Sequence, residues 1–135
     1  MNCKTLLIAA VMAAFAGCTE TAGTRVVIDT ATGDSSVMEC STRLRNRVRV
    51  AKCAYSDVDG IAKATVTLES LVHQRQELQA RMVWLDEDGA EIDADGKSFR
   101  AIVLDGRDFV TFSGLAPNPR GRTAKVQVRE TENAQ

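Results

Sequence analysis

Histidine is almost missing from this sequence of 135 residues, in which His73 is the only one. No serine or cysteine nucleophile is patterned near His73, and no nucleophile elbow occurs elsewhere. A metal site would need further ligands, which the chain does not group at metal-binding spacing. The sequence therefore predicts no enzyme, no metal site and no bound cofactor, and we interpret His73 as an exposed turn residue.

A strong net charge and a long apolar run are missing too. The 17 basic residues nearly balance the 18 acidic ones, which argues against nucleic acid as a partner because a basic face would be expected there. The apolar run over 5–16 is too short for a transmembrane helix, which needs about 20 residues. The chain beyond this run has the length of a single domain.

The apolar run is the core of an N-terminal export signal. Lys4 supplies a positive charge before it, and the tetrad Phe-Ala-Gly-Cys over 15–18 ends it. This tetrad resembles the bacterial lipobox, in which cleavage precedes the cysteine and the cysteine is acylated, although Phe15 replaces the usual Leu. The resemblance implies a lipoprotein signal peptide over 1–17 and a covalent lipid on Cys18. An ordinary cleaved signal and an uncleaved anchor are the alternatives.

The acyl chains of a bacterial lipoprotein would hold the protein at a membrane surface. Each buried methylene contributes about 0.8 kcal/mol, so three chains give essentially permanent attachment. Thr19 follows Cys18, at the position where an Asp tends to retain Gram-negative lipoproteins in the inner membrane. By resemblance to that class, we expect the periplasmic face of the outer membrane. Residues 18–24 would be the lipidated N-terminus and tether, 25–130 the folded domain, and 131–135 a frayed tail.

Two of the four cysteines, Cys40 and Cys53, lie within the expected domain. An oxidising periplasm permits them to form a disulfide. The closed loop of about 14 residues would contribute about 3 kcal/mol through loop entropy. Two buried free thiols are the alternative.

Alternation of apolar and polar residues is the clearest pattern in the domain. It is most regular over 62–72 and 78–84, which we predict to be the strands of a β-hairpin with Met82 and Trp84 in the core. Further short strands, separated by polar turns, are predicted over 26–28, 41–54, 98–103, 109–112 and 123–129. About seven short strands with this periodicity are typical of an all-β fold, an antiparallel β-sandwich.

Four arginines occupy alternate positions within 41–54, namely Arg43, Arg45, Arg47 and Arg49. On a strand they would share one face, about 6.6 Å apart. Such a row could hold an anionic partner, for example lipid A phosphates, peptidoglycan carboxylates or an acidic protein. The alternative is a solvated edge strand whose charges discourage edge-to-edge pairing.

An acidic segment over 91–96 partly imitates a calcium-binding loop. Its first position would be Glu91 instead of Asp, and its twelfth would be Ile102, which has no carboxylate to complete the ligand shell. We therefore interpret 86–89 and 93–96 as two Asp-Gly turns, in which Gly accepts a positive φ.

Several residues resemble those of the YcfL family of small periplasmic lipoproteins. They are Val37-Met38-Glu39, Thr67-Leu68, and the pattern Trp84-x-Asp86-x-x-Gly89 at the end of a strand. Glu69-Ser70 departs from the family, in which an Asn is expected after the Leu. The resemblance covers about 26–130 and implies an immunoglobulin-like sandwich, while no reaction or ligand comes with it.

The anchor and the sandwich together suggest a non-enzymatic module that binds another envelope component, either a protein or peptidoglycan. A structural subunit of an envelope assembly, such as a secretion apparatus, is the alternative. Neither interpretation implies a small-molecule substrate. The membrane, reached through the lipid on Cys18, is a partner in both.

Overall fold

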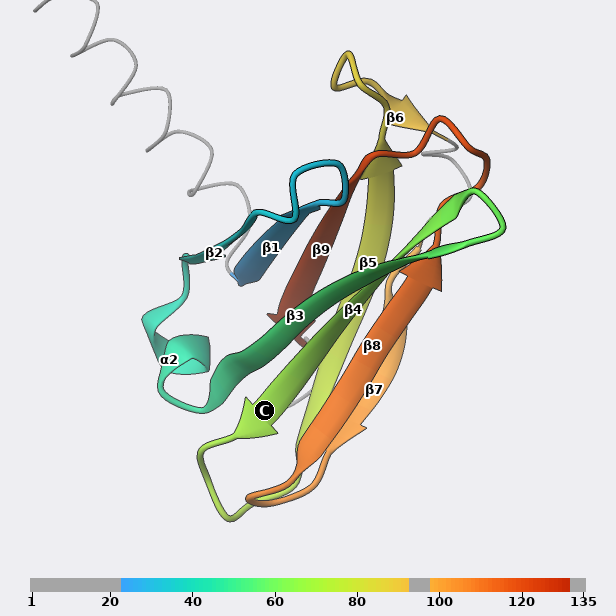
Figure 1. The fold of residues 1–135 in the computed structure, drawn as a ribbon. Coiled ribbons are helices and arrows are strands. Elements are labelled where there is room, and N and C mark those ends of the chain that lie inside the picture. Colours follow the sequence, from blue (N-terminus) through green and yellow to red (C-terminus); the bar gives the residue numbers. More distant parts are fainter. Residues whose placement is uncertain (1–22, 93–97, 132–135) are drawn as a thin grey trace, which may run out of the picture.

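The computed structural model describes residues 23–92 and 98–131. The expected signal peptide, the lipidation site Cys18, the turn at 93–96 and most of the tail lie outside the described residues. The described chain forms two antiparallel β-sheets packed face to face, as the alternation predicted (Figure 1). Among the described residues, no helix combines the length and the apolar character needed to cross a membrane.

The larger sheet has six strands. They are β1 (Thr24–Asp29), β2 (Ser35–Glu39), β5 (Gln76–Leu85), β6 (Glu91–Ile92), β7 (Arg100–Leu104) and β9 (Thr123–Glu130). Their order is β2-β1-β9-β5-β6, and β7 also pairs with β5. β2 and the short β6 are not among the predicted strands, so the described residues hold nine strands instead of about seven.

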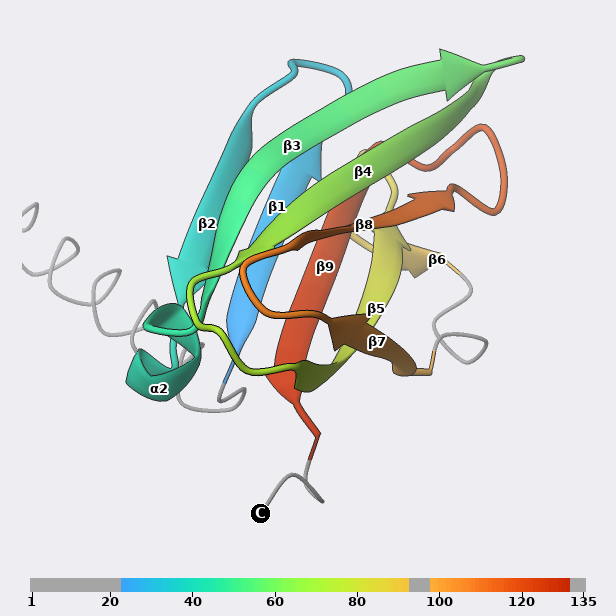
Figure 2. The ribbon, with the colours of Figure 1, turned by 90° about the horizontal axis from the view of Figure 1, so that it is seen from below.

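The smaller sheet has the order β3-β4-β8. Its strands are β3 (Val48–Val58), β4 (Ile61–Ser70) and β8 (Phe109–Leu115). A turn joins β3 to β4, in which Asp59 and Gly60 both have positive φ, 54° and 84°. The Asp57 side chain accepts a hydrogen bond of 2.8 Å from the Gly60 amide and stabilises this turn. Figure 2 shows the smaller sheet lying over one face of β1, β9 and β5.

Apolar side chains at alternate strand positions form the core between the sheets. Trp84 is fully buried and Met82 nearly so, as the pattern predicted. They belong to one cluster with Val66 and Leu68 of β4 and Phe112 of β8, which lie in the other sheet. Removing such side chains from water contributes about 25 cal/mol per Å² of apolar surface, so this cluster holds the two sheets together.

The predicted hairpin of 62–72 and 78–84 is wrong, although both segments are strands. β4 pairs with β3 and β8, whereas β5 pairs with β6, β7 and β9. The connection over 71–75 therefore crosses from the smaller sheet to the larger one. Alternation shows which side of a strand is buried, and both strands bury that side in the same core. The pairing partner does not follow from the pattern.

The predicted strand over 41–54 is wrong in its first half. Residues Thr42–Arg45 form one helical turn, α2, beside the ends of β2 and β3 (Figure 1). Ser41 caps this turn, because its Oγ accepts a hydrogen bond of 3.2 Å from the Leu44 amide. Leu44 is fully buried and attaches the turn to the core. The four arginines therefore do not form one row, since only Arg49 lies on a strand.

Candidate functional site

Three arginines surround an open hollow at the α2 end of the sandwich, which we call the arginine hollow. Its volume is about 200 Å³. It is lined by Arg43, Arg47, Arg75, Gln76, Glu77, Leu78 and Glu130. Two of the four arginines singled out in the sequence thus come together, although not on a strand. Arg45 and Arg49 are not part of the lining, and Arg49 instead donates to Glu69 across β3 and β4 at 2.9 Å.

Arg75 is the residue of the hollow that the sequence pattern missed. It lies in the connection between β4 and β5. A connection has no periodic pattern, and a single arginine within it is ordinarily a solvated loop residue. Arg75 reaches the hollow because the chain crosses between the sheets at this point.

A buried polar network fixes the two segments that carry these arginines. The Gln76 Nε2 group donates to Ser70 Oγ and to the Arg47 carbonyl, both at 3.1 Å. The Leu71 amide donates to the same carbonyl at 2.8 Å. Gln76 and Ser70 are buried, so these hydrogen bonds satisfy groups that would be costly to bury alone. The backbone around Arg47 is therefore held close to the start of β5, next to Arg75.

The guanidinium groups of the hollow are only partly neutralised. Arg43 Nε lies 3.5 Å from a carboxylate oxygen of Glu130, and this exposed ion pair contributes little stability. Glu77 supplies a second carboxylate to the lining. The Nε of Arg47 is buried and has no hydrogen-bond partner among the described residues. Because this nitrogen is out of reach of solvent, an anionic group in the hollow would be bound chiefly by the exposed guanidinium groups of Arg43 and Arg75.

The described chain begins beside this hollow. The Cys40 amide donates to the Gly23 carbonyl at 3.0 Å, which places Gly23 next to the residues that precede α2. A Cβ at Gly23 would overlap the Val128 carbonyl oxygen, so glycine is required where the chain packs against β9. Glu130, the last residue of β9, lines the hollow. Gly23, the first residue that the structure describes, therefore lies at the end of the domain that carries the arginine hollow.

The expected disulfide between Cys40 and Cys53 is not formed, because Cys53 is a free thiol. The half-buried Cys53 side chain is hydrogen-bonded to Ser35, at the start of β2. Cys40 lies beyond the other end of β2, about 16 Å farther along a strand that rises about 3.3 Å per residue. A disulfide requires Cα atoms within about 7 Å of each other. Burial raises the pKa of the Cys53 thiol, and the Ser35 hydrogen bond opposes this shift.

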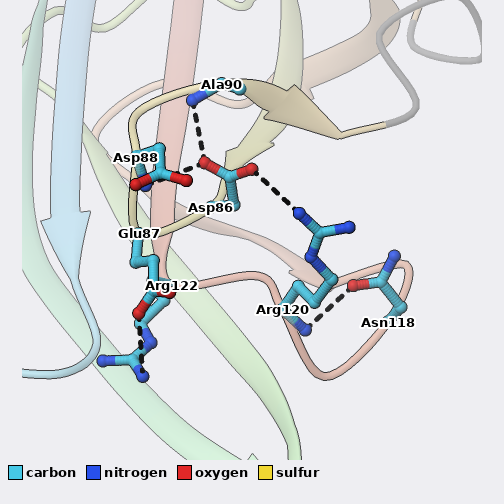
Figure 3. Close-up of polar contacts among 7 residues, drawn as sticks. All are labelled: Asp86, Glu87, Asp88, Ala90, Asn118, Arg120 and Arg122. Carbon is cyan, nitrogen blue, oxygen red and sulfur yellow. Dashed lines mark hydrogen bonds and ion pairs between the residues drawn. The ribbon is translucent and has the colours of Figure 1, made fainter.

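The pattern over 84–89 ends in the turn between β5 and β6, at the end of the sandwich away from α2 (Figure 1). Figure 3 shows the polar contacts of this turn. Asp86 Oδ1 accepts hydrogen bonds from the amides of Asp88 and Ala90, at 2.9 and 3.0 Å. The predicted Asp-Gly turn is confirmed, and its glycine has a φ of 82°. The other carboxylate oxygen of Asp86 lies 3.5 Å from a guanidinium nitrogen of Arg120, in the connection before β9. This pattern therefore serves to join two loops.

An Asp86→Ala variant is expected to lower the free energy of unfolding by about 1–2 kcal/mol, because two backbone amides lose their acceptor. Chemical denaturation of the purified protein measures this loss. Asp88→Ala is the matched control, since its carboxylate makes no hydrogen bond within the described part of the chain, and a change below about 0.5 kcal/mol is expected. Equal losses in the two variants would contradict the structural role of Asp86.

The other residues considered for chemistry are dispersed. Ile102, the twelfth position of the calcium-like segment, is buried in the core, and Glu91 pairs with Lys125 at 3.3 Å. His73 is exposed in the connection between the sheets. Residues 93–97, which hold most of that segment, lie outside the described residues. Across 23–92 and 98–131, no group of three or more His, Cys, Asp or Glu side chains is placed to hold a metal ion.

Comparisons with known proteins place this fold among related chains. A family model described as "Protein of unknown function (DUF1425)" matches residues 34–130. The crystal structure of a DUF1425 family member from Shewanella sp. pv-4 is similar, with 24% identity, a TM-score of 0.58, and coverage of 82% of this chain and 91% of that chain. Campylobacter jejuni cj0090 is also similar, with 19% identity, a TM-score of 0.54, and coverage of 61% and 85% respectively. These likenesses show a shared fold. No curated protein matches the chain in sequence.

Proposed function

The chain belongs to the DUF1425 family, and on that premise we propose that it is a YcfL-type lipoprotein whose sandwich binds another component of the cell envelope. A lipid on Cys18 anchors it to the periplasmic face of the outer membrane. The bound component is a protein or peptidoglycan, and the binding involves no catalysis. The tetrad over 15–18 supports the anchor, and the arginine hollow supports the binding.

The arginine hollow is the observation that carries this proposal. It brings the guanidinium groups of Arg43, Arg47 and Arg75 together from two segments of the chain. Guanidinium groups bind carboxylates and phosphates through paired, charge-assisted hydrogen bonds. A carboxylate of peptidoglycan or of an acidic protein would pair with the exposed guanidinium groups of Arg43 and Arg75. It would also compete with Glu130 for Arg43, whose ion pair is weak.

The position of the hollow suits a partner at the membrane surface. Gly23 lies at the same end of the sandwich as α2 and the hollow. Five residues lead from Cys18 to Gly23, and even a fully extended chain spans only about 3.6 Å per residue, or about 18 Å in all. This tether would keep the hollow close to the bilayer. The expected partner is therefore an envelope component that reaches the membrane surface.

Photo-crosslinking in intact cells tests this function. A photo-crosslinking amino acid in place of Arg45, an exposed residue of α2 beside the hollow, is expected to capture one envelope protein or peptidoglycan. The same amino acid in place of Lys63, on β4, is the control and is expected to capture neither. Recovery of a multi-subunit membrane complex would favour the alternative, a structural subunit of an envelope assembly. If position 45 yields nothing beyond position 63, the proposed function is wrong.

The charge of the hollow is tested separately by changing Arg43, Arg47 and Arg75 together to Gln. The crosslinked product at position 45 is expected to fall about tenfold or more, because charge-assisted hydrogen bonds contribute about 1.5–3 kcal/mol each. The free energy of unfolding is expected to change by less than about 1 kcal/mol, since two of the three side chains are exposed. The matched control changes three exposed cations elsewhere, Lys52, Arg120 and Arg122, to Gln. Equal product from both triple variants would exclude the arginine hollow as the binding surface.

A further inference from the structure

The strand β2 forms an open edge of the larger sheet. Figure 2 shows it as the outermost strand on one side, and among the described strands it pairs only with β1. All five of its residues are exposed. Val37 and Met38, which are 45% and 42% exposed, lie on opposite faces of the strand. Such an edge offers main-chain groups and apolar surface to another strand.

The hydrogen bonds between β1 and β2 show which main-chain groups of β2 point outward. The Asp29 amide donates to the Asp34 carbonyl at 2.8 Å, and the Cys40 amide donates to the Gly23 carbonyl at 3.0 Å. Directly opposite residues of antiparallel strands alternate between pairs that exchange hydrogen bonds and pairs that do not. The even-numbered residues of β2 therefore bond to β1. The N–H and C=O groups that point to the open edge are those of Ser35, Val37 and Glu39.

The strand β2 lacks the features that usually keep edge strands from pairing. Lysines, prolines and bulges protect such edges in natural proteins. β2 contains no lysine or proline, its register with β1 is unbroken, and its one charged residue, Glu39, stands at its end. β3, at an edge of the smaller sheet, differs, because its register shifts between Val50 and Lys52 and it carries Arg49 and Asp57. β2 is therefore open to pairing in a way that β3 is not.

The sequence of β2 is self-complementary in antiparallel pairing. A two-fold axis at its middle residue makes the same strand of two copies into one isologous contact. The resulting pairs are Val37 with Val37, Ser36 with Met38, and Ser35 with Glu39. The outward-pointing residues then lie opposite one another and can exchange main-chain hydrogen bonds. Each Glu39 faces a serine, so no like charges meet.

The segments on either side of β2 carry opposite charges. Asp34, in the turn before β2, is exposed, and so is Arg45 of α2, which follows β2. Neither forms an ion pair within the described part of the chain. Antiparallel pairing brings the turn of each copy toward α2 of the other. A second copy of this chain therefore suits the open edge in both register and charge.

We propose that two copies of this chain pair through β2, which joins their larger sheets into one. The two Gly23 residues then lie about 25 Å apart, because three strand spacings of about 4.8 Å and six residue rises of about 3.4 Å separate them. Each copy has a tether of at most about 18 Å between Gly23 and Cys18, so both predicted anchors can reach one membrane. This dimer goes beyond the proposed function, because β2 shares no residue with the arginine hollow.

Photo-crosslinking in intact cells tests the dimer. The cells produce the full chain with two different C-terminal tags, and one version carries a photo-crosslinking amino acid in place of Met38. The expected product contains both tags and has twice the mass of the chain. Leu115, which is 51% exposed on β8, is the control position and is expected to give no such product. Capture of a different protein at position 38, or no product beyond that at position 115, would overturn the proposal.

Charges placed on the two-fold axis test the register. Val37→Glu in both versions, or Val37→Lys in both, sets like charges opposite each other, and the product at position 38 is expected to fall about fivefold. Val37→Glu in one version and Val37→Lys in the other is expected to restore it, which also shows that both variants fold. Equal product in all three combinations, or no recovery in the mixed pair, would contradict pairing about Val37. Both tags identify a product of two copies, at position 45 as well, so dimerisation is not mistaken for capture of an envelope partner.

Discussion

A Cys18→Ser variant is expected to lose all incorporated lipid and to leave the membrane fraction. Serine has no thiol to receive an acyl chain, and the cysteine is the acylated residue in the lipoproteins that the tetrad over 15–18 resembles. Without acyl chains, no buried methylene groups remain to hold the domain at the bilayer, at about 0.8 kcal/mol for each methylene. Labelling with a palmitate analogue, followed by fractionation of the cells, measures both effects.

Cys53→Ser is the matched control for this experiment. Cys53 is a half-buried free thiol on β3, so its replacement removes one cysteine without touching the predicted anchor. The control is expected to incorporate the label and to remain with the membranes. If Cys18→Ser also remains labelled and membrane-bound, the predicted anchor is wrong.

Replacing Trp84 by alanine is expected to lower the free energy of unfolding by about 3–5 kcal/mol. Trp84 is fully buried, and its neighbours in register, Ala124 and Ile92, lie on the strands to either side. Gly121 passes so close that a Cβ there would lie 3.4 Å from the indole ring. Alanine would leave a cavity that these regular strands are poorly able to fill. The melting temperature of a domain of this size should fall by more than about 12 °C.

Phe109→Ala provides the comparison for Trp84→Ala. Phe109 is also aromatic and lies on a strand, but it is 55% exposed. Its removal is expected to cost less than about 1 kcal/mol, because little of its surface leaves water on folding. Calorimetry or thermal denaturation of the two variants measures the difference. Similar melting temperatures would contradict the assignment of Trp84 to the centre of the core.

The faces of the strands could be predicted from the sequence, but their partners could not. Residues 62–72 and 78–84 alternate clearly, and the side chains expected inside, including Trp84, are buried. A period of two residues identifies the buried side of each strand. In a sandwich, the buried sides of the strands of both sheets face the same core. Whether two successive strands pair with each other or face each other across the core depends on the path of the connection. The connection over 71–75 crosses between the sheets, so the predicted hairpin is absent.

The arginines illustrate a different limit of prediction. Their alternate spacing is compatible with a strand, but Ser41 and the buried Leu44 stabilise a helical turn instead. The arginine hollow also depends on Arg75 and Glu130, which come from distant parts of the chain. The turn at Asp86 was predictable because its hydrogen bonds are local, whereas its contact with Arg120 spans 34 residues. Hydrogen bonds between neighbouring residues can be predicted from a sequence. Contacts between distant segments become known only when the fold is known.

Lipidation of Cys18 is the property on which the proposed function depends most directly. Mass spectrometry of the mature protein, extracted from cell membranes, tests it without any substitution. The predicted result is an N-terminal peptide that begins at Cys18 and carries acyl chains on that residue. A mature chain that begins at another residue, or at an unmodified Cys18, would contradict a lipid-anchored binding module.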